Sequence, residues 1–79
     1  MTVDDLRIDQ LGVITECLAD NTALGRLSEM GLIPGATVRL VRRALFGGPL
    51  EVQVGQTHLA LRRQLARAVL VDVRESGAQ

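Results

Sequence analysis

The chain has 79 residues and no net charge, and 47% of its residues are hydrophobic. This length predicts one domain with a thin core, the hydrophobic fraction excludes a disordered chain, and the neutrality argues against nonspecific nucleic-acid binding. No apolar run approaches the ~20 residues that span a bilayer, and the acidic N-terminus lacks the order of a signal peptide, so we expect a cytoplasmic protein.

Charge is distributed unevenly along the chain. Residues 1–38 carry six acidic residues against two arginines, a net charge of −4, whereas residues 39–79 carry seven arginines against three acidic residues, a net charge of +4. The chain contains no lysine. Because guanidinium groups make planar, bidentate contacts, the second half is the place to look for arginine-mediated contacts.

The first part of the chain predicts one strand and one short helix. Residues 13–18 alternate in polarity as a strand does. Asp20 or Asn21 can cap a helix over about residues 22–30. A helix this short is not stable alone, so it must pack on the strands through the residues of one face, which are Leu24, Leu27 and Met30.

The helix is predicted to end in a glycine–proline bend. Gly31 suits the left-handed position that closes a helix, and Pro34 prevents the helix from resuming. Leu32 and Ile33 then lie in an extended turn, where both fill the core or one stands exposed as a contact residue. Gly35 completes this bend before the next strand.

Two strands are predicted over residues 37–43 and 50–54, joined by a second bend. The first strand has two faces, formed by Val38, Leu40 and Arg42 on one side and by Thr37, Arg39, Val41 and Arg43 on the other. The glycines Gly47 and Gly48 permit positive φ in the bend, and Pro49 is tolerated where a strand begins.

The second bend also carries two large apolar residues, Leu45 and Phe46. Phe46 is the only aromatic residue of the chain. It either packs as a satellite of the core or stands exposed as a recognition residue.

The last third of the chain predicts a hairpin, a helical turn and a closing strand. Gly55 begins a two-residue loop typical of a type II′ turn, and a strand follows over residues 57–62, with Leu59 and Leu61 facing inward. A helical turn is expected over 62–67 and a strand over 68–73. Residues 74–79 are polar and are expected to fray.

These elements predict one mostly β domain over residues 1–79, with its core over about residues 6–73. Five short antiparallel strands, one inserted α-helix and a short helical turn before the last strand fit a small SH3-like barrel, in which closure removes exposed sheet edges. An open α+β sandwich is the alternative. The two differ in whether the last strand pairs with the first.

The chain lacks the residue patterns of catalytic and metal sites. One histidine, His58, and one cysteine, Cys17, cannot alone supply the ligands of a zinc site. No acidic cluster has calcium-loop spacing, and no catalytic-triad or phosphate-loop pattern occurs. We therefore predict no catalytic residues, no metal site, no cofactor and no enzymatic activity, with His58 exposed on a strand and Cys17 filling space in one.

Three motifs, in order, resemble the FeoA family. RLSEMGLIPGATV at residues 26–38 is similar to the family's Arg-Leu-x-(Glu/Asp)-(Met/Leu)-Gly-Leu-x-Pro-Gly-x-x-Val. GGPL at residues 47–50 resembles its second bend, and LALRRQLA at residues 59–66 resembles its Ile-Ala-Leu-Arg-x-x-x-Ala ending. The likeness covers about residues 6–73.

The resemblance implies an SH3-like barrel that serves as a cytosolic, non-catalytic accessory protein of bacterial ferrous iron uptake. The implied partner is the cytosolic, GTP-binding side of the ferrous iron permease, so the chain would reach the membrane through that partner and would not insert into it. We predict that the two bends supply the contacts, through Leu32, Ile33, Pro34, Leu45 and Phe46. The sequence leaves open whether the protein also forms a weak homo-oligomer.

Two other functions are consistent with the sequence. One is a metal-sensing or regulatory module related to the C-terminal domain of metal-dependent repressors, with His58, Cys17 or acidic residues as ligands. The other is a nucleic-acid-binding barrel that uses Arg42, Arg43, Arg62, Arg63 and Arg67. Neighbouring strand residues face opposite ways, so Arg42 and Arg43 could share a patch only if their strand bulged.

Overall fold

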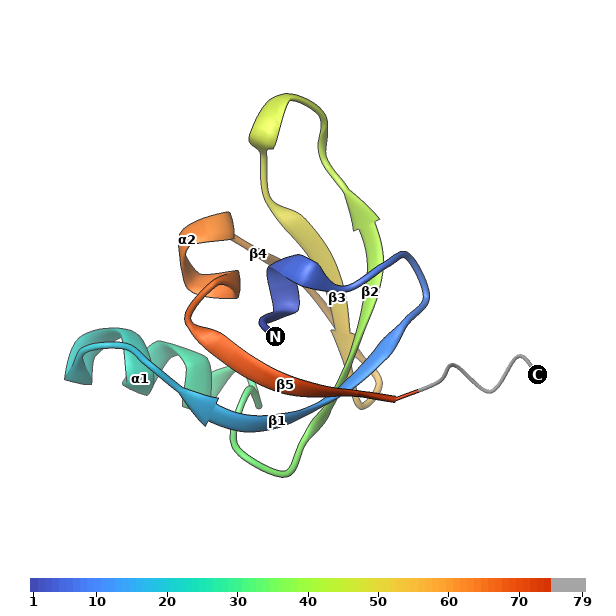
Figure 1. Ribbon diagram of the computed structural model, residues 1–79. Helices are drawn as coiled ribbons and strands as arrows, with labels where there is room; N and C mark the ends of the chain where they lie inside the picture. Colours follow the sequence, from blue (N-terminus) through green and yellow to red (C-terminus); the bar gives the residue numbers. More distant parts are fainter. Residues whose placement is uncertain (75–79) are drawn as a thin grey trace.

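A computed structural model describes residues 1–74. The predicted mostly β fold is confirmed, with five strands, one α-helix and short helical turns (Figure 1). In chain order the elements are η1 (Val3–Asp5), β1 (Leu11–Cys17), α1 (Asn21–Glu29), β2 (Thr37–Arg43), η2 (Leu45–Gly47), β3 (Leu50–Val54), β4 (Thr57–Leu61), α2 (Arg63–Ala66) and β5 (Val69–Arg74). Arg74 therefore belongs to the last strand, and the rest of the predicted frayed tail lies outside the described residues.

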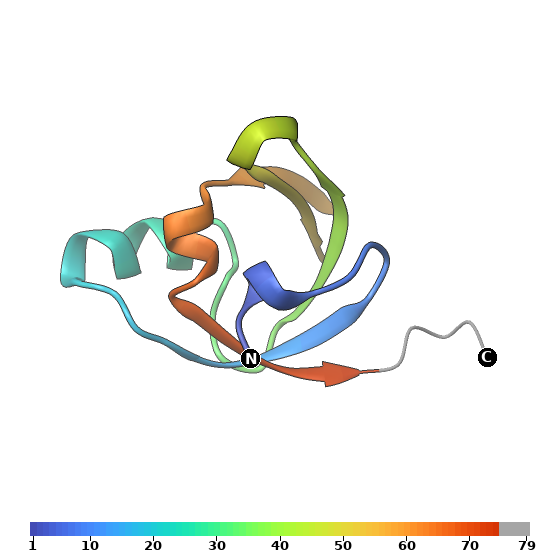
Figure 2. The ribbon, with the colours of Figure 1, turned by 45° about the horizontal axis from the view of Figure 1, so that its top comes forward.

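The strands form one curled antiparallel sheet in the order β4-β3-β2-β1-β5. β5 pairs with β1 from Leu11–Arg74 to Cys17–Val69, which is the pairing that distinguishes a barrel from an open sandwich. Within the described residues β4 and β5 do not pair with each other, so the sheet keeps two edges, and α2 connects them (Figure 2).

The core fills the inside of this curl and extends closer to the N-terminus than predicted. The strands contribute alternate residues, and the helical segments add Val3, Leu27 and Ala66. The buried hydrophobic residues are Val3, Leu6, Ile14, Leu27, Leu32, Val38, Leu40, Leu50, Val52, Leu61, Ala66, Val69 and Val71. Sequence periodicity did not indicate η1, because three residues are too few to show a helical repeat.

The ends of α1 explain why Leu32 is buried. The Asp20 carboxylate accepts a hydrogen bond from the Ala23 N–H at 2.8 Å and caps the start. At the other end Gly31 has φ 86°, and the Leu32 N–H donates to the Leu27 carbonyl at 2.8 Å. This is the hydrogen bond of a Schellman motif, in which the two bonded residues also pack together. Leu32 is therefore turned onto Leu27 in the core.

The end of β2 departs from the predicted alternation. The register shifts between Leu40 and Arg42, so that Arg42 lies opposite Glu51 and Arg43 lies opposite Leu50. Residues opposite one another project to the same side, so Arg42 points outward with Glu51, and Arg43 points to the side of the buried Leu50. The prediction that Arg42 shares the face of Leu40 is wrong, because the extra residue of a β-bulge reverses the alternation.

The predicted turn residues differ in whether they provide a positive φ angle or space for a neighbouring atom. Positive φ angles occur at Gly31 (86°), Gly35 (93°), Gly47 (74°) and Gly55 (60°). Gly48 has φ −71°. A Cβ atom there would lie 2.9 Å from the Ala44 Cβ, so Gly48 provides space and not a left-handed turn. Pro49 comes just before β3, and its carbonyl accepts the Ala44 N–H at 3.0 Å.

Candidate docking surface

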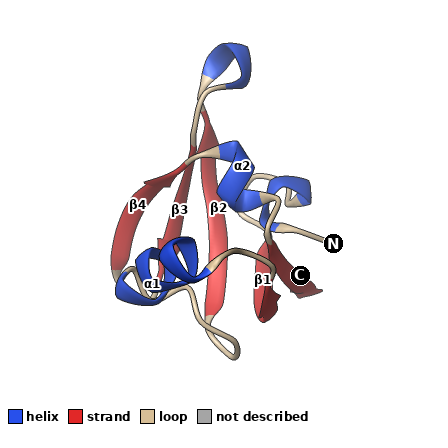
Figure 3. Ribbon diagram, turned by 90° about the vertical axis from the view of Figure 1, so that its left-hand side faces the viewer, coloured by secondary structure: helices blue, strands red, loops and turns tan. Residues whose placement is uncertain are grey.

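The two bends predicted to bind a partner lie at opposite ends of the molecule (Figures 1 and 3). Ile33 and Pro34 precede the start of β2, whereas Leu45 and Phe46 follow its end. The seven residues of β2 separate the bends, which amounts to roughly 20 Å of strand. Leu32 is only 1% exposed and belongs to the core. One small contact therefore cannot use both bends, and Leu32 cannot be an exposed anchor.

The loop Ala44–Pro49, here called the tip, carries the most exposed apolar side chains of the described chain. Phe46 is 101% exposed and Leu45 is 79% exposed, against 46% for Ile33. The tip is closed on itself by two backbone hydrogen bonds, from Ala44 N–H to the Pro49 carbonyl at 3.0 Å and from Gly48 N–H to the Leu45 carbonyl at 3.2 Å. It thus presents two apolar residues on a closed loop.

Phe46 also has an unfavourable backbone conformation. Its φ of 59° and ψ of 38° lie in the left-handed region, which a bulky side chain adopts only at a cost of about 1–2 kcal/mol. The phenyl ring makes up none of this cost by burial in its own chain, since it is fully exposed. Such strain clusters at functional sites, and here it falls on the residue predicted for recognition.

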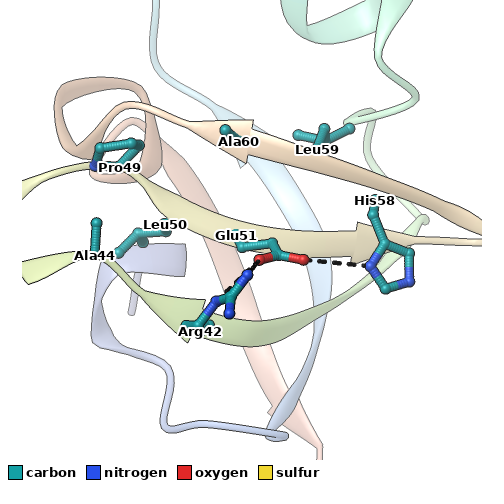
Figure 4. Close-up of a pocket in the computed structure, with 8 residues that line it drawn as sticks. All are labelled: Arg42, Ala44, Pro49, Leu50, Glu51, His58, Leu59 and Ala60. Atoms are coloured by element: carbon teal, nitrogen blue, oxygen red, sulfur yellow. Dashed lines mark hydrogen bonds and ion pairs between the residues drawn. The ribbon is translucent and has the colours of Figure 1, made fainter.

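A shallow groove adjoins the tip on the outer face of β3 and β4 (Figure 4). Its volume is about 520 Å³, and its lining residues are Arg42, Ala44, Pro49, Leu50, Glu51, His58, Leu59 and Ala60. Its charges compensate one another, because Glu51 contacts Arg42 Nη2 at 2.5 Å and His58 Nδ1 at 3.6 Å. The hydrogen bond from Arg42 holds the pKa of Glu51 below its ordinary value. The groove is thus apolar at the tip and locally neutral beyond it.

On its other side the tip adjoins a cluster of arginines around Asp4. The carboxylate of Asp4 is 11% exposed and contacts Arg43 at 3.1 Å, Arg63 at 3.3 Å and Arg67 at 3.2 Å. Burial raises the pKa of Asp4, but hydrogen bonds from the three arginines outweigh it and hold the pKa below the ordinary value. A Cβ atom on Gly47 would lie 3.5 Å from Arg63 Nη1, so this cluster touches the tip.

The three arginines of this cluster are among the five that the sequence offered as a basic patch, but Asp4, the carboxylate that joins them, was not predicted. Asp4 at its centre is on η1, Arg43 is on β2, and Arg63 and Arg67 lie in and directly after α2. The sequence separation of Asp4 and Arg67 is 63 residues. The bulge in β2 sends Arg43 to Asp4 and Arg42 to Glu51. Although β2 bulges, the two arginines therefore do not share a patch.

The remaining reactive side chains lie apart from one another. Cys17 is half-buried, and its Sγ donates to the Leu32 carbonyl at 3.6 Å. Burial raises the pKa of this thiol, so it is a poor nucleophile and metal ligand. His58 is exposed on β4. Within residues 1–74 no three His, Cys, Asp or Glu side chains gather as a metal site would require, and no helix there could span a bilayer.

Comparisons with known proteins agree with the sequence motifs. The family model of the FeoA domain matches residues 1–73. FeoA of Stenotrophomonas maltophilia, described as an SH3 domain protein and solved in complex with zinc, is 33% identical over 98% of this chain and 99% of its own, with a TM-score of 0.82. FeoA of Chlorobium tepidum is 29% identical over 92% of this chain and 70% of its own, with a TM-score of 0.86.

The same fold occurs as part of longer regulators. A manganese-dependent transcriptional repressor in complex with manganese has a TM-score of 0.83, is 20% identical, and matches 94% of this chain but 36% of its own. At this identity the likeness shows the fold alone. Comparison with curated proteins gives no significant match.

Proposed function

Since this chain belongs to the FeoA domain family, which is involved in ferrous iron transport, we propose that it is a non-catalytic accessory protein whose tip docks on the cytosolic, GTP-binding domain of the ferrous iron permease. The family is an accessory domain of transport and is not a known enzyme family. The Stenotrophomonas maltophilia protein has been suggested to act as an activating factor of ferrous iron transport. Docking would place this chain at the membrane through its partner.

One observation carries the assignment of the docking site to the tip. Phe46 is fully exposed and strained, and Leu45 beside it is 79% exposed. Neither the strained backbone of Phe46 nor the exposure of the two side chains stabilises the folded monomer. Buried in a partner, an aromatic anchor of this size can contribute a few kcal/mol, as anchors at the centre of interfaces do. The apolar side of the neighbouring groove extends the contact through Ala44, Pro49 and Ala60.

The proposal is tested by capturing the purified cytosolic domain of the permease on this protein. Phe46→Asp should abolish capture, because a carboxylate in place of the ring cannot enter an apolar pocket. Ile33→Asp places the same charge on an exposed apolar residue at the opposite end, and it should capture the domain as the unchanged protein does. Circular dichroism checks that both variants are folded.

Two results would contradict this assignment. Normal capture by folded Phe46→Asp would remove the tip from the interface. Loss of capture with Ile33→Asp alone would move the interface to the other end of β2. If the unchanged protein binds the domain neither in the presence nor in the absence of guanine nucleotide, the permease domain is not its partner.

A further inference from the structure

The arginine cluster has more positive charge than the protein itself neutralises. Arg43, Arg63 and Arg67 all converge on Asp4. In the described part of the chain no second acidic side chain forms an ion pair with any of the three. Three guanidinium groups against one carboxylate leave a local excess of two positive charges. An excess of this kind at a protein surface attracts an external anion.

The cluster also keeps guanidinium donors available. Arg67 is 60% exposed and uses its Nε to bind Asp4. Arg63 binds Asp4 through Nε and Nη2, and its Nη1 is the atom beside Gly47. An arginine has five N–H donors in a planar fork that matches a carboxylate. Asp4 thus orients the guanidinium groups and leaves part of each fork unoccupied.

These donors lie at the same end of the molecule as the tip. In Figure 2, where this end comes forward, η2, α2 and η1 are seen together around one end of the curled sheet. The tip therefore adjoins the arginine cluster at Gly47 and the neutral groove at Ala44 and Pro49. A partner that covers this end meets an apolar anchor with positive charge on one side only.

We propose that the arginine cluster is the second half of the docking surface, and that it binds an acidic segment of the partner protein whose carboxylates pair with Arg63 and Arg67 while Phe46 enters an adjacent apolar pocket. This inference rests on the proposed function and specifies the chemistry of the partner. A nucleic acid or a lipid surface would present phosphates to both sides of the tip, whereas the excess charge is on one side. A protein segment with a local acidic cluster matches that asymmetry.

The test measures the dissociation constant for the permease's cytosolic domain at increasing salt concentrations. Arg67→Gln should weaken binding roughly threefold to fivefold, as expected for the loss of one partly exposed ion pair. Arg67→Glu should weaken it roughly tenfold or more, because it places like charges together, and it should flatten the salt dependence. Arg74→Glu, the same charge reversal at the end of β5, is the matched control and should change affinity little.

The Arg67 variants should still fold, because Asp4 keeps Arg43 and Arg63 as partners in them. Arg67→Lys adds a second check, since it keeps the charge but loses the fork, and it should bind with an affinity between the unchanged protein and Arg67→Gln. The thermal midpoint of each variant shows that the affinity change does not come from unfolding.

The possible results separate this inference from the proposed function. If Phe46→Asp abolishes binding while Arg67→Glu binds with unchanged affinity and salt dependence, the acidic-segment inference fails and the docking tip stands. If the unchanged protein also binds phosphatidylglycerol vesicles or a 20-nucleotide RNA, and Arg67→Glu removes that binding but not binding to the permease domain, the arginine cluster serves a phosphate ligand and the inference is overturned.

Discussion

Phe46 is the residue at which local structure and function conflict most clearly. A turn that served stability alone would have glycine or asparagine at φ 59°, because those residues adopt the left-handed region at little cost. The sequence instead places its only aromatic residue there, fully exposed. The contact that we propose with a partner would explain why this side chain is there.

Replacing Phe46 with asparagine should separate stability from binding. Asparagine tolerates the left-handed conformation, so Phe46→Asn should leave the free energy of unfolding unchanged or raise it by about 0.5–1 kcal/mol. The same variant should lose capture of the permease domain. Urea denaturation followed by circular dichroism measures the stability. A loss of more than about 1 kcal/mol would mean that the ring stabilises the monomer, and the argument from strain would fail.

Leu32 gives the opposite prediction, although it is in the family motif and next to the first bend. Because Leu32 is 1% exposed and belongs to the core, Leu32→Ala should lower the free energy of unfolding by about 2–5 kcal/mol. That is a large share of the stability of a chain this short. A shift of the urea midpoint no larger than that of Ile33→Ala, an exposed neighbour, would contradict the burial of Leu32.

At the scale of elements, the carboxylate of Asp4 links η1 to both β2 and α2. Asp4 contacts arginines from both elements, and Arg43 also donates to the Leu6 carbonyl at 2.9 Å. Asp4→Asn would leave the three guanidinium groups facing one another without a counter-charge. We expect this substitution to lower the free energy of unfolding at neutral pH by about 2 kcal/mol. Asp9→Asn, which removes one exposed pair with Arg39, should cost less than about 1 kcal/mol.

The same carboxylate predicts how stability changes with pH. The pKa of Asp4 in the folded protein lies below its ordinary value of 3.8. Its stabilising contribution is therefore complete above pH 3.8, and it is lost as the pH falls through the lower pKa of the folded state. Urea midpoints measured from pH 7 down to pH 2.5 should fall more steeply for the unchanged protein than for Asp4→Asn. Parallel curves would show that folding does not lower the pKa of Asp4.

The elements that could be predicted from the sequence depend on local chemistry. The cap at Asp20, the glycine that ends α1 and the alternation of β3 each involve a few neighbouring residues, and the structure has them all. The bulge in β2 and the docking of η1 depend on residues far apart in the chain, since Arg43 meets Asp4 and Leu6 only after folding. No local pattern of hydrophobicity encodes those contacts.

The candidate site was predictable to a similar extent. The chain has only one aromatic residue, Phe46, and it stands with Leu45 in a predicted bend, so the sequence indicates these two residues as recognition groups. Whether Leu32 or Ile33 is the exposed member of the first bend depends on the helix-closing motif at Gly31. The sequence indicated Arg43, Arg63 and Arg67 among five arginines of a possible patch, but it could not indicate that Asp4 joins them, because the four residues come from separate segments of the chain.

At the scale of the whole molecule, the two bends are separated by the length of β2 and cannot act together in one small contact. The end that carries the tip combines exposed apolar residues, a neutral groove and a cationic cluster, whereas the opposite end presents the exposed Ile33 and Pro34. We therefore propose that the partner docks at the end of the barrel that carries η2, α2 and η1.

The most direct test of this claim is photo-crosslinking in cells that express the permease. A photoreactive phenylalanine analogue is placed at position 46 or, in a separate variant, at position 33, and the adducts are identified by mass spectrometry. We predict an adduct with the permease's cytosolic domain from position 46 and none from position 33. An adduct from position 33 alone, or none from either position while ferrous iron uptake is normal, would contradict the assignment of the tip as the docking site.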